Sequence, residues 1–235
     1  MHKVASNKTI LGLGSNAQIT TGGLYLSNVE NVVVQNIAFS NASDDSISID
    51  QNSHQIFIDH NDFSAANDGL LDIIRGSNYI TVSWNRFRNH DLTTLVGHDD
   101  SQTSDRGRLK VTYHHNWFDG TDQRQPRVRF GEVHVFNNYY GNPNAMYGIG
   151  VGVEAKVVSE NNYFDTKNPT LFLDKSSMKG YIKDSGSYFA KGSPKLAPTG
   201  IKWKPSSYYS YTLDRAADVK NIVMQGAGVG KTRNN

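Results

Sequence analysis

The chain has 235 residues, a formal net charge of +2 and no cysteine. So small a net charge argues against a strongly basic nucleic-acid-binding face, and no apolar run reaches the length of a membrane-spanning helix. The lack of cysteine excludes a disulfide scaffold and thiolate metal sites. We therefore expect neither a nucleic-acid nor a membrane partner. With 37% hydrophobic residues and 21 glycines, the composition is typical of a loop-rich β protein.

The N-terminal residues 1–11 lead directly into β-like sequence and contain no apolar signal-peptide region. We therefore expect the N-terminus of this chain to be truncated.

A repeated unit then runs along the chain. Each copy is an alternating apolar run followed by asparagine and, shortly after, an aromatic residue. The asparagines are Asn36, Asn61, Asn85, Asn116, Asn138 and Asn162. The aromatic residues are Phe39, Phe63, Phe87, Phe118, Tyr140, Phe164 and, in a weaker copy, Phe189.

The spacing of these aromatics predicts a solenoid, because it is 24, 24, 31, 22, 24 and 25 residues. Each period holds two or three short β runs separated by Gly, Asn, Asp or Ser, with neither a leucine skeleton nor a helical period. We therefore predict an all-β, parallel β-helix of roughly seven or eight coils, each about 4.8 Å above the last. The recurrent asparagines should form an amide ladder and the aromatics an internal stack.

The one long period predicts an insertion. We place its extra residues in the polar segment 98–107, and insertions in a solenoid often border the binding face.

The repeat ends near residue 190. We expect a single domain, residues 1–235, with coils over 1–192 and a C-terminal extension over 193–235 that packs on the solenoid. Residues 214–224 are predicted to form a short helix with Asp214 as its N-cap.

Two acidic groups fall in step with the period. Asp45 and Asp68 are 23 residues apart, so they should stack on adjacent coils, and Asp72 follows in the same coil as Asp68. Oxygen ligands without His or Cys favour calcium. Each aspartate taken singly is better explained as a turn residue, and it is their register with the period and with the arginines that favours a shared site.

A basic stretch follows the insertion. Arg124, Arg127 and Arg129 lie within six residues around Pro126, and Arg127 and Arg129 should share one face of a strand. Three guanidinium groups this close repel one another, so either solvent or a carboxylate-rich ligand must lie among them.

Several motifs together resemble those of the pectate lyases of polysaccharide lyase family 1. They are Ile58-Asp-His60, Asp68-Gly-Leu-Leu-Asp72, Gly76–Ser83, His90-Asp91, Val111–Asn116 and Arg124-Gln-Pro-Arg-Val-Arg-Phe-Gly131. The resemblance covers the chain from about residue 10 to its end. It implies a right-handed parallel β-helix that is secreted, monomeric and active on polygalacturonate or pectin.

The resemblance also implies roles for individual residues. It implies a Ca²⁺ site at Asp45, Asp68 and Asp72. Arg124 would be the catalytic base of a β-elimination, Arg129 would bind a substrate carboxylate, and Arg127 would support substrate binding.

One position departs from the family pattern. A lysine usually follows His-Asp in the segment written here as His90-Asp91, whereas this chain has Leu92. Because that lysine helps to hold a substrate carboxylate, its loss leaves the preference between unesterified and methylated pectin open.

Other functions compete with a calcium-dependent pectate lyase. A calcium-independent pectin lyase would not need the three aspartates, and a catalytically impaired β-helix would only bind pectate. A polygalacturonase would use paired carboxylates, of which Asp44-Asp45 gives a faint echo without a complete acid–base set.

Overall fold

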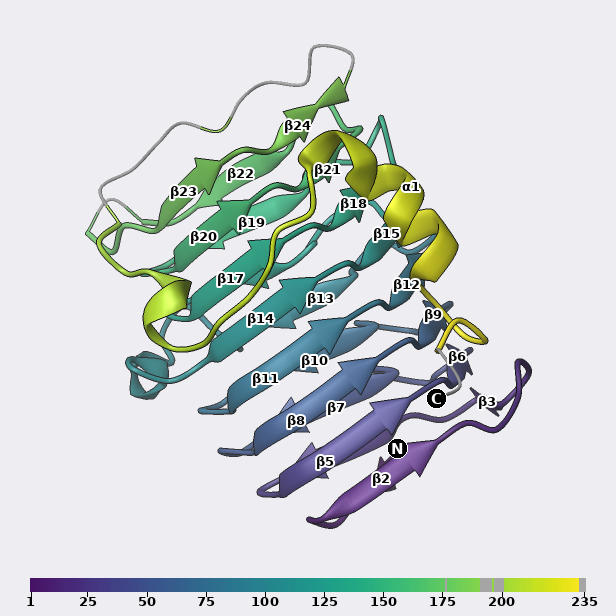
Figure 1. The fold of residues 1–235 in the computed structure, drawn as a ribbon. Coiled ribbons are helices and arrows are strands. Elements are labelled where there is room, and N and C mark those ends of the chain that lie inside the picture. The colour runs from purple at the N-terminus through teal and green to yellow at the C-terminus, as the bar shows by residue number, and fades with distance from the viewer. Residues whose placement is uncertain (176, 191–195, 197–200, 233–235) are drawn as a thin grey trace.

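The computed structural model describes residues 1–175, 177–190, 196 and 201–232. The described chain winds through three eight-stranded parallel sheets, so that each turn of the solenoid contributes one strand to each sheet (Figure 1). This confirms the predicted right-handed parallel β-helix. The expected boundary between residues 192 and 193 lies outside the described residues.

The strands of each sheet follow one another in chain order. Sheet A contains β1 (His2–Lys3), β4 (Leu24–Ser27), β7 (Ile47–Asp50), β10 (Leu71–Ile73), β13 (Thr94–Val96), β16 (Arg127–Val128), β19 (Ile149–Gly152) and β22 (Thr170–Leu173). Sheet B contains β2 (Lys8–Leu11), β5 (Glu30–Gln35), β8 (His54–Asp59), β11 (Asn78–Ser83), β14 (Lys110–His114), β17 (Glu132–Phe136), β20 (Lys156–Glu160) and β23 (Tyr181–Ser185). Sheet C contains β3 (Gln18–Thr20), β6 (Ala38–Ser40), β9 (Asp62–Ser64), β12 (Arg86–Arg88), β15 (Trp117–Asp119), β18 (Tyr139–Tyr140), β21 (Tyr163–Phe164) and β24 (Tyr188–Phe189).

The predicted asparagine ladder runs through the turns between sheets B and C. Each side-chain amide donates to the Oδ1 atom of the next asparagine, at 3.0, 3.1, 2.9 and 3.1 Å from Asn61 through Asn85, Asn116 and Asn138 to Asn162. All five side chains are fully buried. The ladder therefore satisfies polar groups that would otherwise be orphaned inside the solenoid.

Asn36 was wrongly assigned to this ladder. Ile37 occupies the ladder position of its coil, because its backbone nitrogen donates to Asn61 Oδ1 at 3.0 Å. Asn36 donates instead to the carbonyl oxygens of Gly12 and Gly14, both at 2.7 Å. The reason is visible in the spacing, since Asn36 precedes its aromatic residue by three positions and the other asparagines precede theirs by two.

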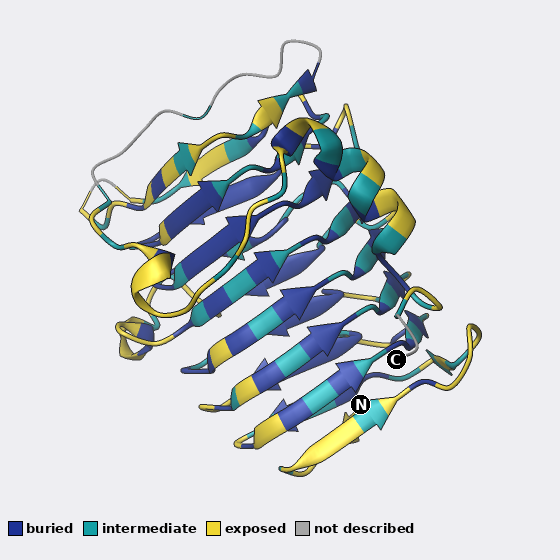
Figure 2. Cartoon of the chain, viewed as in Figure 1, coloured by how far each residue is buried: buried dark blue, intermediate teal, exposed yellow. Residues whose placement is uncertain are grey.

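The predicted aromatic stack fills the interior beside sheet C. Ring centroids of neighbouring members lie 4.4 to 5.3 Å apart with interplanar angles of at most 17°. The stack comprises Phe39, Phe63, Phe87, Phe118, Tyr140, Phe164 and Phe189. Figure 2 shows the central strands largely buried and β2, at the N-terminal end, exposed.

The insertion lies where it was predicted. It links β13 of sheet A to β14 of sheet B and includes a short 3-10 helix, η1 (Thr103–Asp105). Buried Asp105 accepts a hydrogen bond from the backbone nitrogen of Gly76 at 2.7 Å, which ties the insertion to the preceding coil.

The C-terminal segment crosses the outer face of sheet B as a strap and ends in α1 (Ala216–Gly226), which packs beside β18 and β21 (Figure 1). A second short 3-10 helix, η3 (Pro205–Ser207), begins the strap. Asp214 is not the N-cap of α1, because its carboxylate contacts His115 Nε2 at 2.8 Å and Arg215 takes the cap position. Among the described helices, none is long and apolar enough to cross a membrane.

Replacing the central ladder residue tests its contribution. Asn116→Ala removes the acceptor of both the backbone nitrogen and the side-chain amide of Asn85, and it removes the side-chain donor to the Val82 carbonyl and to Asn138 Oδ1. We expect a loss of about 3 kcal/mol or more in the free energy of unfolding, measured by urea denaturation. The exposed Asn144→Ala is the matched control. Equal unfolding midpoints for the two variants would contradict a stabilising ladder.

Candidate active site

The outer face of sheet A carries one charged column along the solenoid. Register partners on successive strands are Ser48, Asp72, Leu95, Arg127 and Gly150. Asp72 and Arg127 point outward because their neighbours on each strand belong to the buried core. The alternation of strand side chains thus places an acidic group two coils before a basic one on the same face.

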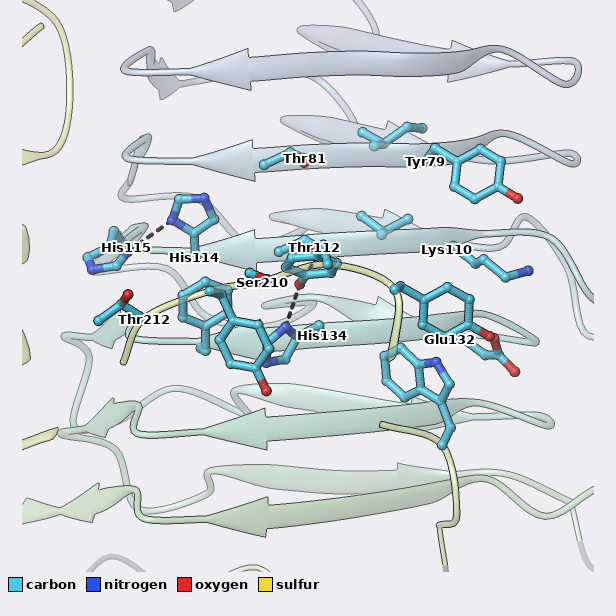
Figure 3. A pocket seen from close by; sticks show the side chains of 17 residues that line it. Tyr79, Thr81, Lys110, Thr112, His114, His115, Glu132, His134, Ser210 and Thr212 are labelled. Carbon is cyan, nitrogen blue, oxygen red and sulfur yellow. Dashed lines mark hydrogen bonds between the residues drawn. The ribbon is translucent and has the colours of Figure 1, made fainter. Parts of the chain in front are cut away.

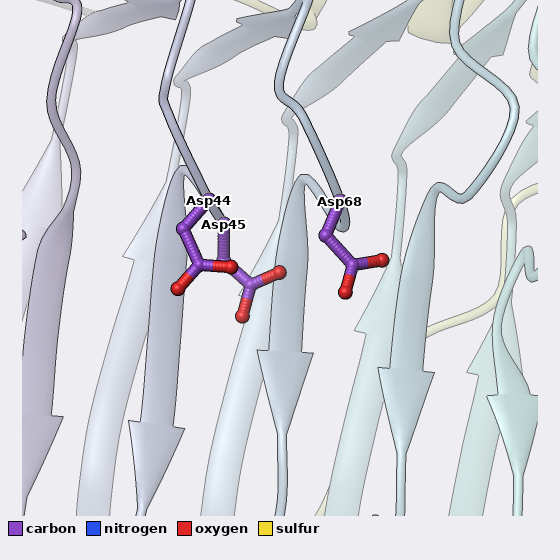
Figure 4. Close-up of side chains that lie close together, drawn as sticks. All are labelled: Asp44, Asp45 and Asp68. Carbon is purple, nitrogen blue, oxygen red and sulfur yellow. The ribbon is translucent and has the colours of Figure 1, made fainter.

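Three aspartates in the segments that lead into β7 and β10 lie close together. Carboxylate oxygens of Asp44, Asp45 and Asp68 lie within 4.8 Å of one another (Figure 4). Asp45, Asp68, Asp72 and Arg124 line one cavity of about 660 Å³ on sheet A. All three predicted aspartates therefore line this cavity, but Asp72 is not in the group of mutually close carboxylates, which instead contains Asp44, a residue not predicted as a metal ligand.

Burial and mutual repulsion disfavour the charged forms of Asp45 and Asp72. Burial, together with the neighbouring Asp44 and Asp68, raises the pKa of Asp45 to about 6. The pKa of Asp72 is also raised well above its usual value, first by burial and then by Asp45. Arg124 acts in the opposite direction on Asp72, so this cation lies close enough to influence it.

The acidic cluster has the properties of a cation site. Buried Asp72 Oδ1 has no hydrogen-bond partner among the described residues. A Cβ atom built on Gly69 would lie 2.4 Å from this oxygen and 3.0 Å from Asp45 Oδ1, and the Gly69 backbone nitrogen donates to Asp45 Oδ1 at 2.8 Å, so a larger residue would not fit between the two carboxylates. Converging, acceptor-only oxygens fit a hard cation.

Arg124 lies in the turn that leads into β16 (Arg127–Val128). Its carbonyl oxygen accepts the backbone nitrogen of Thr94 at 2.7 Å, which fixes it against the preceding coil. Its φ of 56° is left-handed, but this conformation recurs at many coil turns and does not by itself mark Arg124 as functional. Its buried Nε atom has no hydrogen-bond partner among the described residues.

Arg127 and Arg129 lie further along sheet A. Neither is among the described residues that line the aspartate cavity. Burial, and then the charges of Arg129 and Arg124, lower the pKa of Arg127, so the three arginines repel one another as expected. Arg129 is buried and its Nε atom contacts Asp100 Oδ1 at 2.6 Å. The sequence indicates the segment containing Asp100 only as an insertion.

Leu92 sits beside the site. It pairs in a parallel bridge with Gln123, the residue before Arg124, and its side chain is half-buried. The position of the family's usual lysine is thus next to Arg124 and holds an apolar side chain in this protein.

A second cavity, of about 630 Å³, lies between sheet B and the C-terminal strap (Figure 3). His134 lines this cavity. Its Nδ1 atom contacts the Tyr209 hydroxyl at 2.5 Å, and its Nε2 atom contacts Glu160 Oε2 at 2.9 Å. Burial lowers the pKa of His134 to about 4 and that of His114 to about 3, so both histidines are neutral at physiological pH. The contacts of His134 therefore hold the strap against sheet B.

The acidic cluster should make stability depend on pH in a metal-free protein. Because the pKa of Asp45 is raised to about 6, its contribution to stability is fully present below the unfolded-state value near 4 and is lost as the pH rises through 6. Asp45→Asn should therefore gain stability over wild type between pH 4 and pH 7, by roughly 3 °C in melting temperature in chelator.

The matched control is Asp218→Asn, at an exposed carboxylate whose pKa is lowered by Arg215. This variant should gain nothing as the pH rises. A difference between Asp45→Asn and wild type that stays flat or shrinks from pH 4 to pH 7 would contradict the proposed repulsion.

Comparisons with known proteins agree with this geometry. A family model described as pectate lyase matches residues 1–232. A pectate trisaccharide-lyase of Thermotoga maritima is 39% identical over 97% of this chain and 72% of the relative. Pectate lyase E of Dickeya chrysanthemi is 34% identical over 97% of this chain and 72% of the relative.

Solved structures give the same result. A pectate lyase from Bacillus sp. N165 in complex with trigalacturonate superposes with a TM-score of 0.86 at 35% identity, covering 98% of this chain and 77% of that one. A pectate lyase bound to a hexasaccharide gives a TM-score of 0.82 at 30% identity, over 98% of this chain and 69% of that one. Together with the matched family model, these likenesses show that the chain belongs to the pectate lyase family.

Proposed function

We propose that the protein cleaves α-1,4-polygalacturonate by calcium-assisted β-elimination, releasing unsaturated oligogalacturonides. The observation that carries the proposal is the cavity on sheet A in which Asp45, Asp68 and Asp72 lie with Arg124. An acidic cluster beside a cation suits a substrate that carries a carboxylate on every sugar. Like its relatives, the protein is a carbon–oxygen lyase acting on a polysaccharide.

Calcium is the cofactor that the acidic cluster supports. Asp45, Asp68 and Asp72 would hold it, because they offer only oxygen ligands and Asp72 Oδ1 is buried without a partner. Bound there, the ion would supply positive charge that stabilises the anion developing next to the substrate carboxylate. Asp44 adds a fourth negative group within reach of Asp45 and Asp68.

Arg124 is proposed as the catalytic base. It would take the proton from C5 of the sugar, a C4–C5 double bond would form, and the C4–oxygen bond would break, with the leaving oxygen taking up a proton. An arginine acts as a base only in its neutral form. The side chain of Arg124 lines the aspartate cavity, and its Nε atom has no hydrogen-bond partner among the described residues.

Arg129 and Arg127 are proposed to bind the substrate. Arg127 lies on the outer face of sheet A two strands beyond Asp72, and Arg129 follows at the end of β16 (Arg127–Val128). Guanidinium groups pair with carboxylates in a defined geometry, so these residues would orient neighbouring sugars of an acidic chain.

Leu92 favours a second candidate, action on methylated pectin. An apolar side chain beside Arg124 would accommodate a methyl ester better than a lysine would. Against this stands the acidic cluster, which a calcium-independent pectin lyase would not need.

We also propose that the protein is secreted, because a polymeric substrate is met outside the cell. We propose in addition that it acts as a monomer.

Product analysis tests the reaction directly. Polygalacturonate should yield ultraviolet-absorbing unsaturated products at a rate that rises into the alkaline range and is abolished by a calcium chelator. Arg124→Lys should lower kcat at least a hundredfold, because it removes the proposed base. Unchanged turnover in chelator would refute the calcium role. Reducing ends without ultraviolet absorbance would indicate a hydrolase, and no products at all would indicate a binding protein.

Restoring the missing lysine tests the substrate preference. Leu92→Lys adds a cation beside Arg124 and should lower KM for polygalacturonate several-fold, with no gain on highly methylated pectin. Leu92→Met, which is neutral and of similar length, is the matched control. If wild type prefers methylated pectin and Leu92→Lys does not shift that preference, the role given to position 92 is wrong.

A further inference from the structure

The insertion after β13 folds back to contact Arg129, which directly follows β16. Asp100 Oδ1 accepts a hydrogen bond from Arg129 Nε at 2.6 Å, joining groups 29 residues apart in the chain. The neighbouring Asp99 does not share this contact. It stabilises the loop itself, since its Oδ1 atom accepts the backbone nitrogen and the hydroxyl of Ser101 at 2.8 and 2.6 Å.

Arg129 is held from a second direction by the loop backbone. Its Nη1 atom donates to the carbonyl oxygen of Gly97 at 3.0 Å and, more weakly, to that of His98 at 3.4 Å. Glycines on the adjacent coils make room for it. A Cβ on Gly97, whose φ is +92°, would lie 2.6 Å from the Arg129 carbonyl oxygen, and one on Gly152 would lie 3.2 Å from its Cγ atom.

Asp100 is shared between two cations. Its second oxygen lies 3.2 Å from Lys175 Nζ, which follows β22. Burial alone would raise the pKa of Asp100, but the hydrogen bonds from Arg129 and Lys175 hold it below its ordinary value. Asp100 is therefore a stable anion facing the basic end of sheet A. The side chain of Arg129 is 11% exposed and that of Lys175 is 58% exposed, so the contact with Arg129 is the better protected of the two.

The negative charge of Asp100 has a specific consequence for Arg129, which lies close to Arg127. Arg127 and Arg129 repel each other, so without a fixed counter-charge the guanidinium group of Arg129 would be free to turn away from Arg127. Asp100 and the Gly97 carbonyl engage the Nε and Nη1 atoms, which fixes the plane of the guanidinium group. Its direction is then set before any carboxylate ligand arrives, which lowers the entropic cost of binding.

We propose that Asp100 is a positioning residue for substrate binding: it orients Arg129 from the insertion loop. The inference rests on the proposed function, in which Arg129 contacts a substrate carboxylate. Asp100 itself does not touch the substrate. The insertion thus serves the active site by supplying the partner of a binding arginine.

Steady-state kinetics on polygalacturonate test this inference. Asp100→Asn removes the charge and keeps the shape, so KM should rise about tenfold while kcat changes less than about threefold, because ground-state and transition-state binding are weakened alike. Asp100→Glu should restore KM to within about threefold of wild type. Asp100→Asn with wild-type KM, or without rescue by Asp100→Glu, would overturn the proposal.

A control in the same loop separates positioning from general loosening. Glu154 accepts two hydrogen bonds from Arg106, at 2.8 and 2.6 Å, and so tethers the other end of the insertion. Glu154→Gln loosens that tether without touching the contact between Asp100 and Arg129, and KM should stay at the wild-type value. A rise in KM equal to that of Asp100→Asn would mean that only loop stability matters.

A double-mutant cycle with Arg129→Met distinguishes this inference from the proposed function. If Asp100 acts through Arg129, Asp100→Asn should raise KM no further in the Arg129→Met background. Additive effects would overturn the positioning role while leaving Arg129 as a binding residue. An unchanged KM for Arg129→Met alone would instead refute the substrate-binding role proposed for Arg129.

Discussion

The parallel register between successive coils is the constraint on which the rest of the structure depends. Strand after strand pairs with the equivalent strand of the next coil, so one residue type repeated at the coil period becomes a column of touching side chains. Inside the solenoid the register builds the amide ladder from Asn61 to Asn162 and the ring stack from Phe39 to Phe189. Both are favourable because polar groups are paired and rings lie in contact.

On the outside, the same register brings like charges together, which is unfavourable unless a ligand intervenes. Asp45, Asp68 and Asp72 lie on adjacent coils, where burial and repulsion raise the pKa of Asp45 and that of Asp72. The three arginines crowd together further along sheet A, where burial and then the charges of Arg129 and Arg124 lower the pKa of Arg127. A protein gains nothing in stability from such an arrangement. The arrangement is understandable as a binding surface, because a bound cation would relieve the repulsion among the aspartates and a bound acidic polymer would relieve that among the arginines.

How much the sequence could predict follows from the same constraint. The coil period was readable because aromatic residues recur at near-constant spacing, and it was enough to place Asp45 beside Asp68. Asn36 was misplaced because one residue of spacing decides which side chain joins the ladder. The contacts of Asp100 with Arg129 and of Asp214 with His115 could not be predicted, since both arise where irregular segments fold back over the coils and no period governs them.

We propose that the aspartates of adjacent coils and Arg124 form one calcium-dependent site. The most direct test is a crystal structure of the Arg124→Lys variant with calcium and trigalacturonate. We predict a calcium ion coordinated by Asp45, Asp68 and Asp72 and a sugar carboxylate, with the side chain at position 124 facing C5 of that sugar. Substrate bound elsewhere, or a calcium-free acidic cluster at saturating calcium, would contradict the account.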